Sequence, residues 1–586
     1  MRFSDAPAAS VSRQETTPFP SDSAHPAKES AAGCLAFVTL TAAAAAMACL
    51  LALLPAAGHD QMWFLYMAQR MLHGTHLYGP QLFDSNPPLI VWLSAVPTTL
   101  AAWLHLPSTA VAKLFVVGIE ATVAAACLPM LKVLRPTLSR TALWALAFAY
   151  VAVFAVMPAR DFGQRDHLLT VLCLPYLLAA AMAVEGIPLA RWKAVCVGIA
   201  AGIGLSLKPH QLLVPVAVEA VVFWKGYTRS RSKEFHFLSF RSARSRPAGS
   251  NAEESASQSG TRLLRPELLA LCLTCATYLV AIRILTPDYL TQVLPILRDT
   301  YWAIGSLSPG ALLLQSIQLH VLAAIALALH FVPRPASSQS TPRTLATVLI
   351  AAGIASILAY YLQGTGWYYQ QIPALSFFAL AVWIEMLDLA ACRNLRAPRW
   401  TPWAAAGLSA LALALTAYFS GCSLARPLTF PSGLAADPDP AFFTGLAPET
   451  PVAILTTEVD LSVPPIFVHH LLSAQRMNNL WTLPAILRNE SPGPGGPVAP
   501  KRRIPSARLA ELDRMQHAWM VEDLNRWHPQ LILIERCQDP TVRCQILEDR
   551  HDDLLAWFQR DPAFRATFAH YRYLRSSGPF DAYVPN

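Results

Sequence analysis

The first long apolar run, residues 31–54, contains no charged residue and is the feature that most constrains the fold. About 20 consecutive apolar residues are enough to cross the hydrocarbon core of a bilayer. A polar tail, residues 1–30, precedes this run and lacks the short basic start of a cleaved signal peptide. We therefore expect a disordered cytoplasmic tail followed by a retained membrane helix.

Many further apolar segments predict an α-helical, polytopic membrane protein. The 586 residues are 54% hydrophobic and only 14% charged, which is too apolar for an ordinary soluble enzyme of this length. The segments are predicted at 110–131, 141–157, 167–184, 193–207, 209–224, 267–286, 309–332, 344–362, 371–391 and 402–420. With a shorter segment, 88–104, which we interpret as re-entrant or interfacial, they give roughly 11 to 13 helices within residues 31–424.

Basic residues predict the orientation of these helices. Residues 225–265 hold nine Lys or Arg and three acidic residues, and basic loops stay in the cytoplasm. Part of this loop, 225–266, is rich in Ser, Arg and Glu, which is typical of disorder. The opposite loops then face outward: 55–109, 158–166, 208–211, 287–308 and 363–370. Because much of the net charge of +8 lies in loops, it reports topology and does not indicate nucleic-acid binding.

The composition changes to that of a soluble domain after about residue 425. PVAILTTEV, PQLILIE and FDAYV are typical of strands, and residues 506–527 and 545–560 are typical of helices. We expect residues 425–586 to form a small extracytoplasmic α/β domain. Cys537 and Cys544 within it could form a disulfide or remain free thiols, and the sequence does not decide between them.

Ionisable residues gather directly after the first apolar run, in the predicted outward loop 55–87. Such groups near the hydrocarbon boundary are costly unless they are paired, hydrated or used. Asp60 begins a predicted helix whose apolar side chains would lie in the membrane surface: Met62, Phe64, Leu65, Met67, Ala68, Met71 and Leu72. The alternative is that His59 and Asp60 merely cap this helix.

The pattern around Asp60 resembles the GT-C glycosyltransferases of family 39, bacterial relatives of protein O-mannosyltransferases and of the aminoarabinose transferase that modifies lipid A. The resemblance covers about residues 31–390. It rests on an acidic residue after the first helix, the string WFLYMAQRMLHGTHLYG, and FDSNPPL at the next apolar segment, which match Asp60, Ala68, Gly74, Tyr78, Asn86, Pro87, Pro88 and Leu89. Many relatives have Glu-Lys before the prolines, whereas this chain has Ser85 and Asn86, with Asp84 one place earlier. Phosphate contacts must therefore come from elsewhere in this chain.

The resemblance implies transfer of a sugar from a polyprenyl-phosphate donor to an acceptor on the outer face of the cytoplasmic membrane. Asp60 is then the candidate base, with a pKa raised by partial desolvation. Tyr78, Asp84 and Asn86 become candidate binding residues. The partners implied are the lipid-linked donor and membrane lipids, and neither the sugar nor the acceptor is identified.

A second cluster, ARDFGQRDHLL, follows the segment that ends near Met157. Arg160 and Arg165 are suited to phosphate because a guanidinium can fork onto two oxygens. Asp161 and Asp166 are candidates for a second acid or for the counter-ions of these arginines. The alternative is a salt-bridged loop that fixes helix ends. We expect no cofactor, although a divalent metal held by Asp60 with Asp161 or Asp166 is an alternative.

Two later clusters complete the candidate site. Lys208 and His210 interrupt an apolar stretch, and Lys208 is a candidate phosphate ligand or a snorkelling side chain. Tyr369 and Gln370 are candidate sugar or phosphate contacts, and the aromatic residues around them are also ordinary interface anchors.

Two other functions compete with transfer. A transporter or lipid flippase also needs charges within helices, but it usually places them near the midplane and shows repeated halves. An envelope scaffold would act through the C-terminal domain alone and would leave the membrane clusters unexplained.

Overall fold

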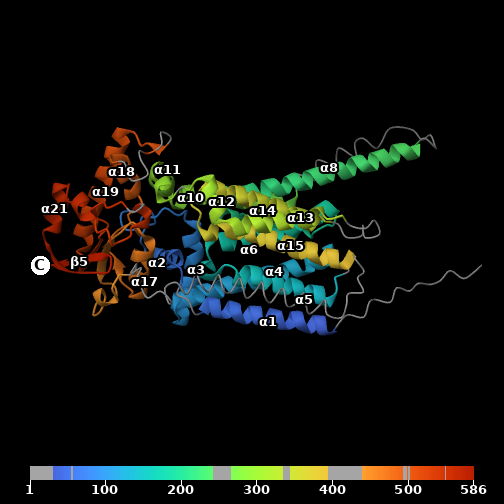
Figure 1. Cartoon of the computed structure of the whole chain (residues 1–586), viewed down its shortest axis with the longest axis horizontal. Helices are drawn as coiled ribbons and strands as arrows, with labels where there is room; N and C mark the ends of the chain where they lie inside the picture. The colour runs from blue at the N-terminus through green and yellow to red at the C-terminus, as the bar shows by residue number, and fades with distance from the viewer. Residues whose placement is uncertain are drawn as a thin grey trace, which may run out of the picture.

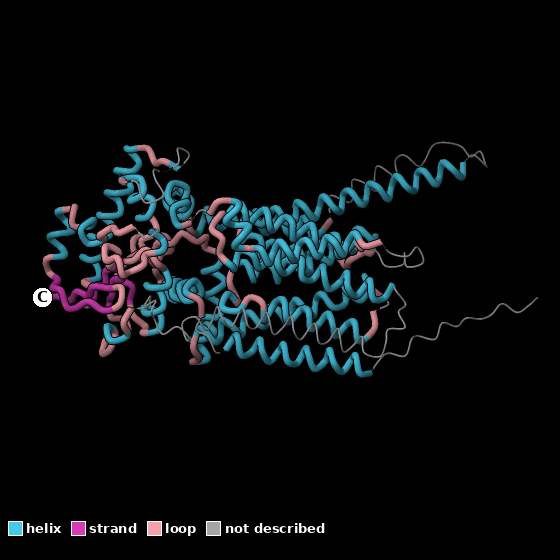
Figure 2. Tube along the Cα trace, viewed as in Figure 1, coloured by secondary structure: helices cyan, strands magenta, loops and turns pink. Residues whose placement is uncertain are grey.

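The computed structural model describes residues 31–53, 57–136, 138–241, 265–305, 307–333, 343–392, 438–491, 498, 502–547 and 550–586. Within these residues the molecule has two parts, a long bundle of helices and a smaller head of helices and strands at one end of the bundle (Figures 1 and 2). The expected fold class, a helical membrane protein with a small α/β domain, is confirmed. The expected tail 1–30 and apolar segment 402–420 lie outside the described residues.

The bundle consists of apolar helices that follow the predicted segments closely. They are α1 Ala31–Leu53, α3 Leu89–Leu104, α4 Ser108–Leu134, α5 Arg140–Val151, α6 Arg165–Glu185, α7 Arg191–Leu207, α8 Leu213–Arg241, α10 Pro266–Leu285, α13 Ile317–Phe331, α14 Thr344–Gln363 and α15 Ile372–Cys392. Six helices of the described chain are long and apolar enough to cross a membrane, and a bent pair would make a seventh. The chain is therefore a multi-pass membrane protein.

Two predicted segments differ from the structure. The segment 309–332 is two helices, α12 Pro309–Gln315 and α13, which meet at Ser316 with a bend of 79°. The loop 225–266, expected to be irregular, is helical at its start because α8 continues to Arg241. Its remaining residues, 242–264, lie outside the described part of the chain.

Short elements connect the helices at the end that carries the head. They are α2 His59–Leu72, the π-helices η1 Ala152–Val156 and η4 Tyr289–Val293, α11 Leu294–Thr300, and the 3-10 turns η2 Ala159–Asp161, η3 Pro209–Leu212, η5 Tyr301–Ile304 and η7 Tyr368–Gln371. These connections contact one another or the head: Gln164 bonds Asp60, the Lys208 ammonium lies over the Tyr369 ring, and Asp299 pairs with Arg508. All the loops predicted to share one side of the membrane therefore lie at one end of the bundle.

Helix α3 begins and ends at this same end. Its first residue, Leu89, lies against Tyr278, and α4 starts three residues after its C-cap, His105. Eight residues into α4, Val116 already packs against Gly163 of the connection that precedes α6. At about 1.5 Å per residue, α3 is also shorter than the hydrocarbon core. This geometry is consistent with the interpretation of the segment as re-entrant or interfacial.

The head is built on a five-stranded sheet of order β2-β1-β3-β5-β4. The strands are β1 Pro451–Leu455, β2 Leu472–Ser473, β3 Leu531–Glu535, β4 Tyr571–Ser577 and β5 Phe580–Pro585. β1 runs parallel to β2 and β3, with Val452 opposite Leu531, whereas β5 is antiparallel to β3 and β4. The three predicted strands are thus present, and they form the centre of the sheet.

Helices of the head are η8 Pro440–Phe442, α17 Val459–Val468, α18 Leu483–Glu490, α19 Ser506–Trp527, η10 Gln545–Leu547, α20 Leu554–Phe558 and α21 Pro562–Phe568. The predicted helix 506–527 is α19. The predicted single helix 545–560 is wrong, since the described residues of this range form a 3-10 turn, a non-helical stretch and the short α20.

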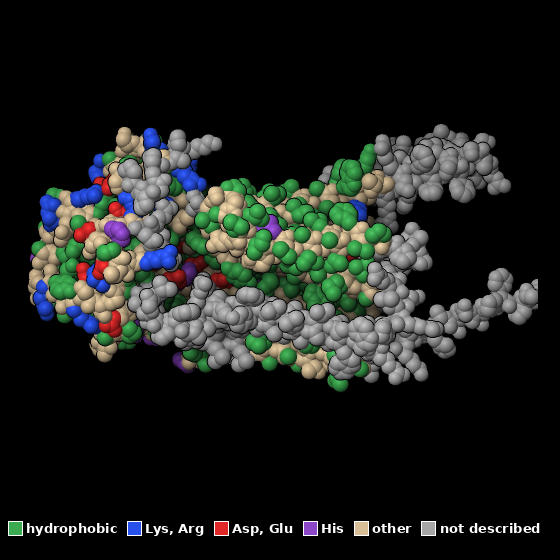
Figure 3. All heavy atoms as spheres, viewed as in Figure 1, with side chains coloured by type: hydrophobic (Ala, Val, Ile, Leu, Met, Phe, Trp, Pro, Cys, Tyr) green, Lys and Arg blue, Asp and Glu red, His purple; other side chains and the backbone are tan. Residues whose placement is uncertain are grey.

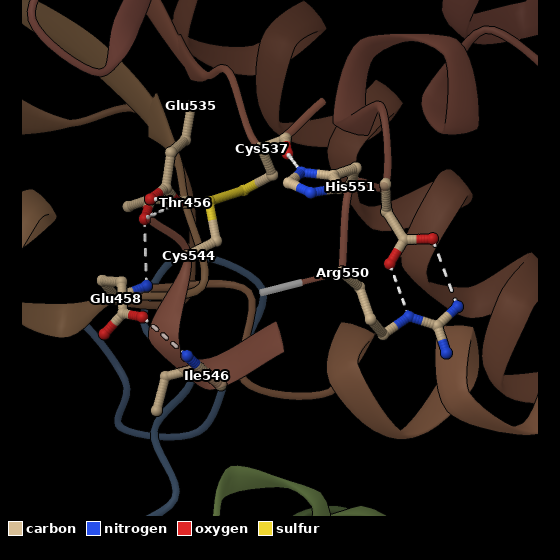
Figure 4. The surroundings of a disulfide bond; sticks show 9 residues. Thr456, Glu458, Glu535, Cys537, Cys544, Ile546, Arg550 and His551 are labelled. Carbon is tan, nitrogen blue, oxygen red and sulfur yellow. Dashed lines mark hydrogen bonds and ion pairs between the residues drawn. A yellow bond between two sulfur atoms is a disulfide. The ribbon is translucent and has the colours of Figure 1, made fainter. Parts of the chain in front are cut away.

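A disulfide joins Cys537 to Cys544 beyond the end of β3 (Figure 4). The buried carboxyl of Glu535 lies beside it and accepts a hydrogen bond of 2.6 Å from Thr456. Burial raises the pKa of Glu535 to about 7, and the nearby Glu458 adds to the rise. Of the two alternatives that the sequence left open for Cys537 and Cys544, the structure has the disulfide.

Candidate functional site

Helix α2 places Asp60 between the bundle and the head. Its apolar side chains pack in one cluster with those of β1 and α17, so Met62, Phe64 and Met67 are buried by protein. The prediction that this face lies in the membrane surface is therefore wrong, because the head covers it. The cap alternative is also wrong: the N-cap residue is Gly58, and no side chain accepts a capping bond.

The Asp60 carboxylate receives three polar contacts. Its Oδ2 accepts a hydrogen bond of 3.3 Å from the Gln164 amide and lies 3.8 Å from Nη2 of Arg165. Its Oδ1 lies 3.3 Å from Nε2 of His59. Burial acts to raise the pKa of Asp60, but the positive charges of His59 and Arg165 outweigh burial and hold the pKa well below its usual range. The expectation of a raised pKa is thus wrong, and Asp60 is a stably ionised carboxylate.

Arg165 links Asp60 to the loop before α3. Its Nη1 donates to the side-chain oxygen of Asn86, and its guanidinium lies 5.3 Å from the Phe64 ring centroid. The Asn86 backbone carbonyl accepts a bond of 2.6 Å from the Tyr78 hydroxyl. Asp60 and Asn86 of the sequence motif thus contact a single guanidinium, and Tyr78 holds the backbone of Asn86.

Asp84 stabilises the loop before α3 through two hydrogen bonds. Its carboxylate is fully buried and accepts bonds from the Trp63 indole, at 3.0 Å, and from the Asn86 backbone amide, at 2.8 Å. Burial raises the pKa of Asp84, although these two bonds oppose the rise. Both contacts hold the loop before α3 in shape, and the predicted binding role of Asp84 stays a prediction.

A second ion pair lies next to the first. Nζ of Lys208 is 3.1 Å from Oδ2 of Asp166, and the ammonium lies 5.1 Å from the Tyr369 ring centroid. Burial lowers the pKa of Lys208 to about 8; Asp166 opposes this effect, and the charge of Arg165 adds to it. Since Asp166 follows Arg165 at the start of α6, the two cations approach the same space from one helix end and one loop.

The remaining predicted residues are less closely joined to this centre. Asp161 is buried on η2, and Gln370 accepts a bond of 2.7 Å from Thr365. His210 lies on η3 close enough for the charge of Lys208 to lower its pKa, after burial, to about 3. The side chain of Arg160 lies outside the described residues, so its predicted role stays a prediction.

Several buried polar atoms around this centre lack a hydrogen-bond partner within the described residues. They include Nε of Arg165, Oε1 of Gln164, Nε2 of His210 and both amide atoms of Gln211. Buried polar atoms are normally paired, and unpaired ones call for an unseen partner such as water or a ligand. Figure 3 shows acidic side chains within a hollow between the head and the bundle. Two of these atoms, Nε of Arg165 and Nε2 of Gln211, are donors that an anion could use.

Sequence reasoning missed three contributors. Gln164 bonds Asp60, and His59 bridges Asp60 to Asp460 of α17. Gln164 carries no charge signal, and Asp460 lies in an ordinary loop-to-helix sequence 400 residues away. Only the docking of the head on α2 brings Asp460 to the site.

The carboxylates Asp60, Asp161 and Asp166 are not among the described groups that have the spacing of a metal site. Within the described residues, one group of three or more side chains has the spacing for a metal, namely Glu535, Cys537 and Cys544. Both cysteines are joined in the disulfide of Figure 4, so their sulfurs are not thiolate ligands. Asp60 is paired with Arg165 and Asp166 with Lys208, and the alternative of a metal held by Asp60 with Asp161 or Asp166 stays a prediction.

Comparisons with known proteins give no family match. No family model and no curated protein matches the chain. Among solved structures, the archaeal oligosaccharyltransferase AglB from Archaeoglobus fulgidus, in complex with an inhibitory peptide and a dolichol-phosphate, is similar at 14% identity with a TM-score of 0.43, over 94% of this chain and 74% of that chain. ArnT from Cupriavidus metallidurans, bound to undecaprenyl phosphate, is similar at 14% identity with a TM-score of 0.48, over 94% of this chain and 98% of that chain. At these scores the likeness is one of outline and does not by itself establish a family.

Proposed function

We propose that the chain is a GT-C glycosyltransferase that moves a sugar from a polyprenyl-phosphate donor to an acceptor on the outer face of the cytoplasmic membrane. The observation that carries this proposal is the convergence of Asp60, Arg165 and Lys208, from three distant segments, at the end of the bundle beneath the head. The site and the head would then lie outside the cytoplasm, as the basic loops indicate.

The two cations suit the leaving group of such a reaction. When the bond between the sugar and the phosphate breaks, negative charge grows on the polyprenyl phosphate. Arg165, whose Nε is unpaired, and Lys208 can donate to those oxygens at the boundary of the membrane, where charge stabilisation is strong.

Asp60 suits the acceptor. As a stably ionised carboxylate it is a weak base but a good hydrogen-bond acceptor for a hydroxyl group. It would orient that hydroxyl toward the sugar and take its proton as the new bond forms and the hydroxyl becomes acidic. The contacts from His59, Gln164 and Arg165 fix the carboxylate in this role.

The first test is turnover of a panel of undecaprenyl-phosphate-linked sugars by the full chain in lipid nanodiscs, followed as release of free undecaprenyl phosphate. We expect Asp60→Asn to lose 100-fold or more of the rate, in the range of about 10²–10⁴ that a positioned acid or base contributes. Asp288→Asn is the matched control, because its carboxylate accepts a solvent-exposed hydrogen bond from Gln292 at the same end. Full activity of the Asp60 variant would contradict the mechanism.

The transporter or flippase remains the competing function, since paired charges also line substrate paths. It predicts that a labelled lipid changes leaflet without release of free undecaprenyl phosphate. The scaffold function predicts that the head alone suffices, which the burial of α2 within the core of the head disfavours.

A further inference from the structure

His59 lies between two carboxylates that belong to different parts of the molecule. Its Nε2 is 3.3 Å from Oδ1 of Asp60, and its Nδ1 is hydrogen-bonded to Oδ1 of Asp460. Asp60 is on α2 beside the bundle, whereas Asp460 is in the first turn of α17 in the head. The imidazole is therefore the polar bridge that connects the head to the site carboxylate.

Both ring nitrogens must donate in this arrangement. A carboxylate only accepts hydrogen bonds, and a neutral imidazole has one N–H, so two carboxylate partners require the imidazolium. Burial would lower the pKa of His59, but Asp60 and Asp460 together raise it to about 10. The charged groups that bear on His59 are these two aspartates, with Arg165 facing Asp60 from α6.

Other contacts also hold α2 against the head. The Tyr66 hydroxyl accepts a bond of 3.0 Å from the backbone amide of Ser473, and Arg70 pairs with Glu449 at 2.9 Å. Asp460 is 65% exposed, so it is not needed to fill the core of the head. Its contact with His59 can be tested without disturbing the packing.

We propose that Asp460 is a positioning residue for Asp60: it holds His59 with both ring nitrogens donating, and His59 fixes the orientation of the Asp60 carboxylate, so that the site is complete only with the head docked. This inference rests on the proposed function for its consequence in catalysis, but the bridge itself can be measured without any reaction.

The test of the bridge is modification of His59 by diethyl pyrocarbonate, which reacts with the neutral form of an imidazole and not with its protonated form. Full-length protein in nanodiscs would be treated at pH 7.5, and the rate at His59 measured by mass spectrometry of its peptide. We expect slow modification in the wild type and a rise of roughly tenfold or more in Asp460→Asn, because each unit of fall in pKa multiplies the neutral fraction by ten. Asp460→Glu, which keeps the charge, should restore protection.

Glu449→Gln is the matched control, because it removes another carboxylate from the same contact between α2 and the head without touching His59. Its rate at His59 should equal that of the wild type. Equal rates in Asp460→Asn and the wild type would overturn the proposal, and so would an equal rise in Glu449→Gln, which would indicate general loosening.

A second arm measures release of undecaprenyl phosphate by the same variants. We expect Asp460→Asn to lower kcat on the order of tenfold with little change in KM for the donor, since misplacement of a catalytic group costs rate. Asp460→Glu should recover much of this loss. If the wild type turns over no donor while His59 reacts as expected, the proposed function fails and the bridge stands; a changed KM with unchanged kcat would overturn the positioning role.

Discussion

At the scale of single residues, the site is defined by how charges are paired. Arg165 and Lys208 each face an aspartate. Nε of Arg165 has no hydrogen-bond partner within the described residues, and the Lys208 ammonium lies over the Tyr369 ring. The pairing alone would also fit a salt-bridged loop, which is the alternative that the sequence left open. The unpaired Nε of Arg165 and the lowered pKa of Lys208 support the proposed phosphate site over a salt-bridged loop.

The lowered pKa of Lys208 predicts a pH-dependent affinity for undecaprenyl phosphate. Burial, with the charge of Arg165, brings this pKa to about 8, so the ammonium is charged below pH 8 and neutral above it. Only the charged form attracts phosphate, and we expect the affinity to fall several-fold as the pH rises from 7 to 9. Native mass spectrometry across this range would measure it.

Two variants check the assignment of this pH dependence. Lys208→Met should bind weakly at every pH, whereas Lys193→Met, which removes a lysine that lies over the Trp192 ring near the start of α7, should behave like the wild type. A wild-type profile that stays flat between pH 7 and 9 would show that Lys208 does not contact the phosphate.

At the scale of elements, apolar length predicted most helices of the bundle to within a few residues, because a bilayer imposes a minimum length on each. The bend at Ser316 was not predicted, because the polar residues around it, Gln315, Gln318 and His320, were included in one apolar segment. Strand β4 was missed because five of its residues are exposed, which removes the apolar alternation that marks a half-buried strand.

The contacts of Asp60 could be foreseen only in part: the motif marked Asp60, Tyr78 and Asn86, but it gave no sign of Asp460.

Close packing of α7 on α10 gives a prediction at this scale. A Cβ added at Gly198 would overlap the backbone oxygen of Glu267 and come within 2.7 Å of the Ala270 Cβ. Gly202, one turn later, is similarly close to Thr274, so the two glycines let the helix backbones approach, as small residues do in membranes. We expect Gly198→Ala to lower the midpoint of thermal unfolding in detergent by several degrees.

Gly118→Ala is the control for this substitution. Gly118 lies in α4, and its added Cβ would meet nothing within 4 Å. Since alanine favours helix over glycine, Gly118→Ala should be neutral or stabilising. An unchanged midpoint for Gly198→Ala would mean that α7 and α10 can separate at little cost.

At the scale of the whole molecule, the head and the loop before α3 share one core. Phe83 is buried, stacks on Trp481 with centroids 6.4 Å apart and meets Trp519 at 4.8 Å, while its backbone amide donates to the Arg476 carbonyl at 2.6 Å. A segment that directly precedes a bundle helix is thus part of the interior of the head.

This shared core predicts that Phe83→Ala destabilises the head and the site together. Loss of a buried phenylalanine costs about 3 to 4 kcal/mol, and the loop that holds Asn86 would lose its support. Hydrogen exchange should increase both in β1 and around Asn86, with a parallel loss of donor turnover. Tyr573→Ala, which truncates an aromatic ring that is 53% exposed, should change neither; increased exchange confined to the head would contradict the coupling.

The sequence distance between the partners of this core also sets the order of events during synthesis. The Tyr66 hydroxyl cannot form its hydrogen bond until the amide of Ser473, which lies 407 residues later in the chain, has been synthesised. At about 5 to 20 residues per second, a ribosome needs roughly 20 to 80 seconds to supply it. During that interval the apolar side chains of α2 lack the cover that the head later provides. A chaperone or the insertion machinery would have to shield that surface.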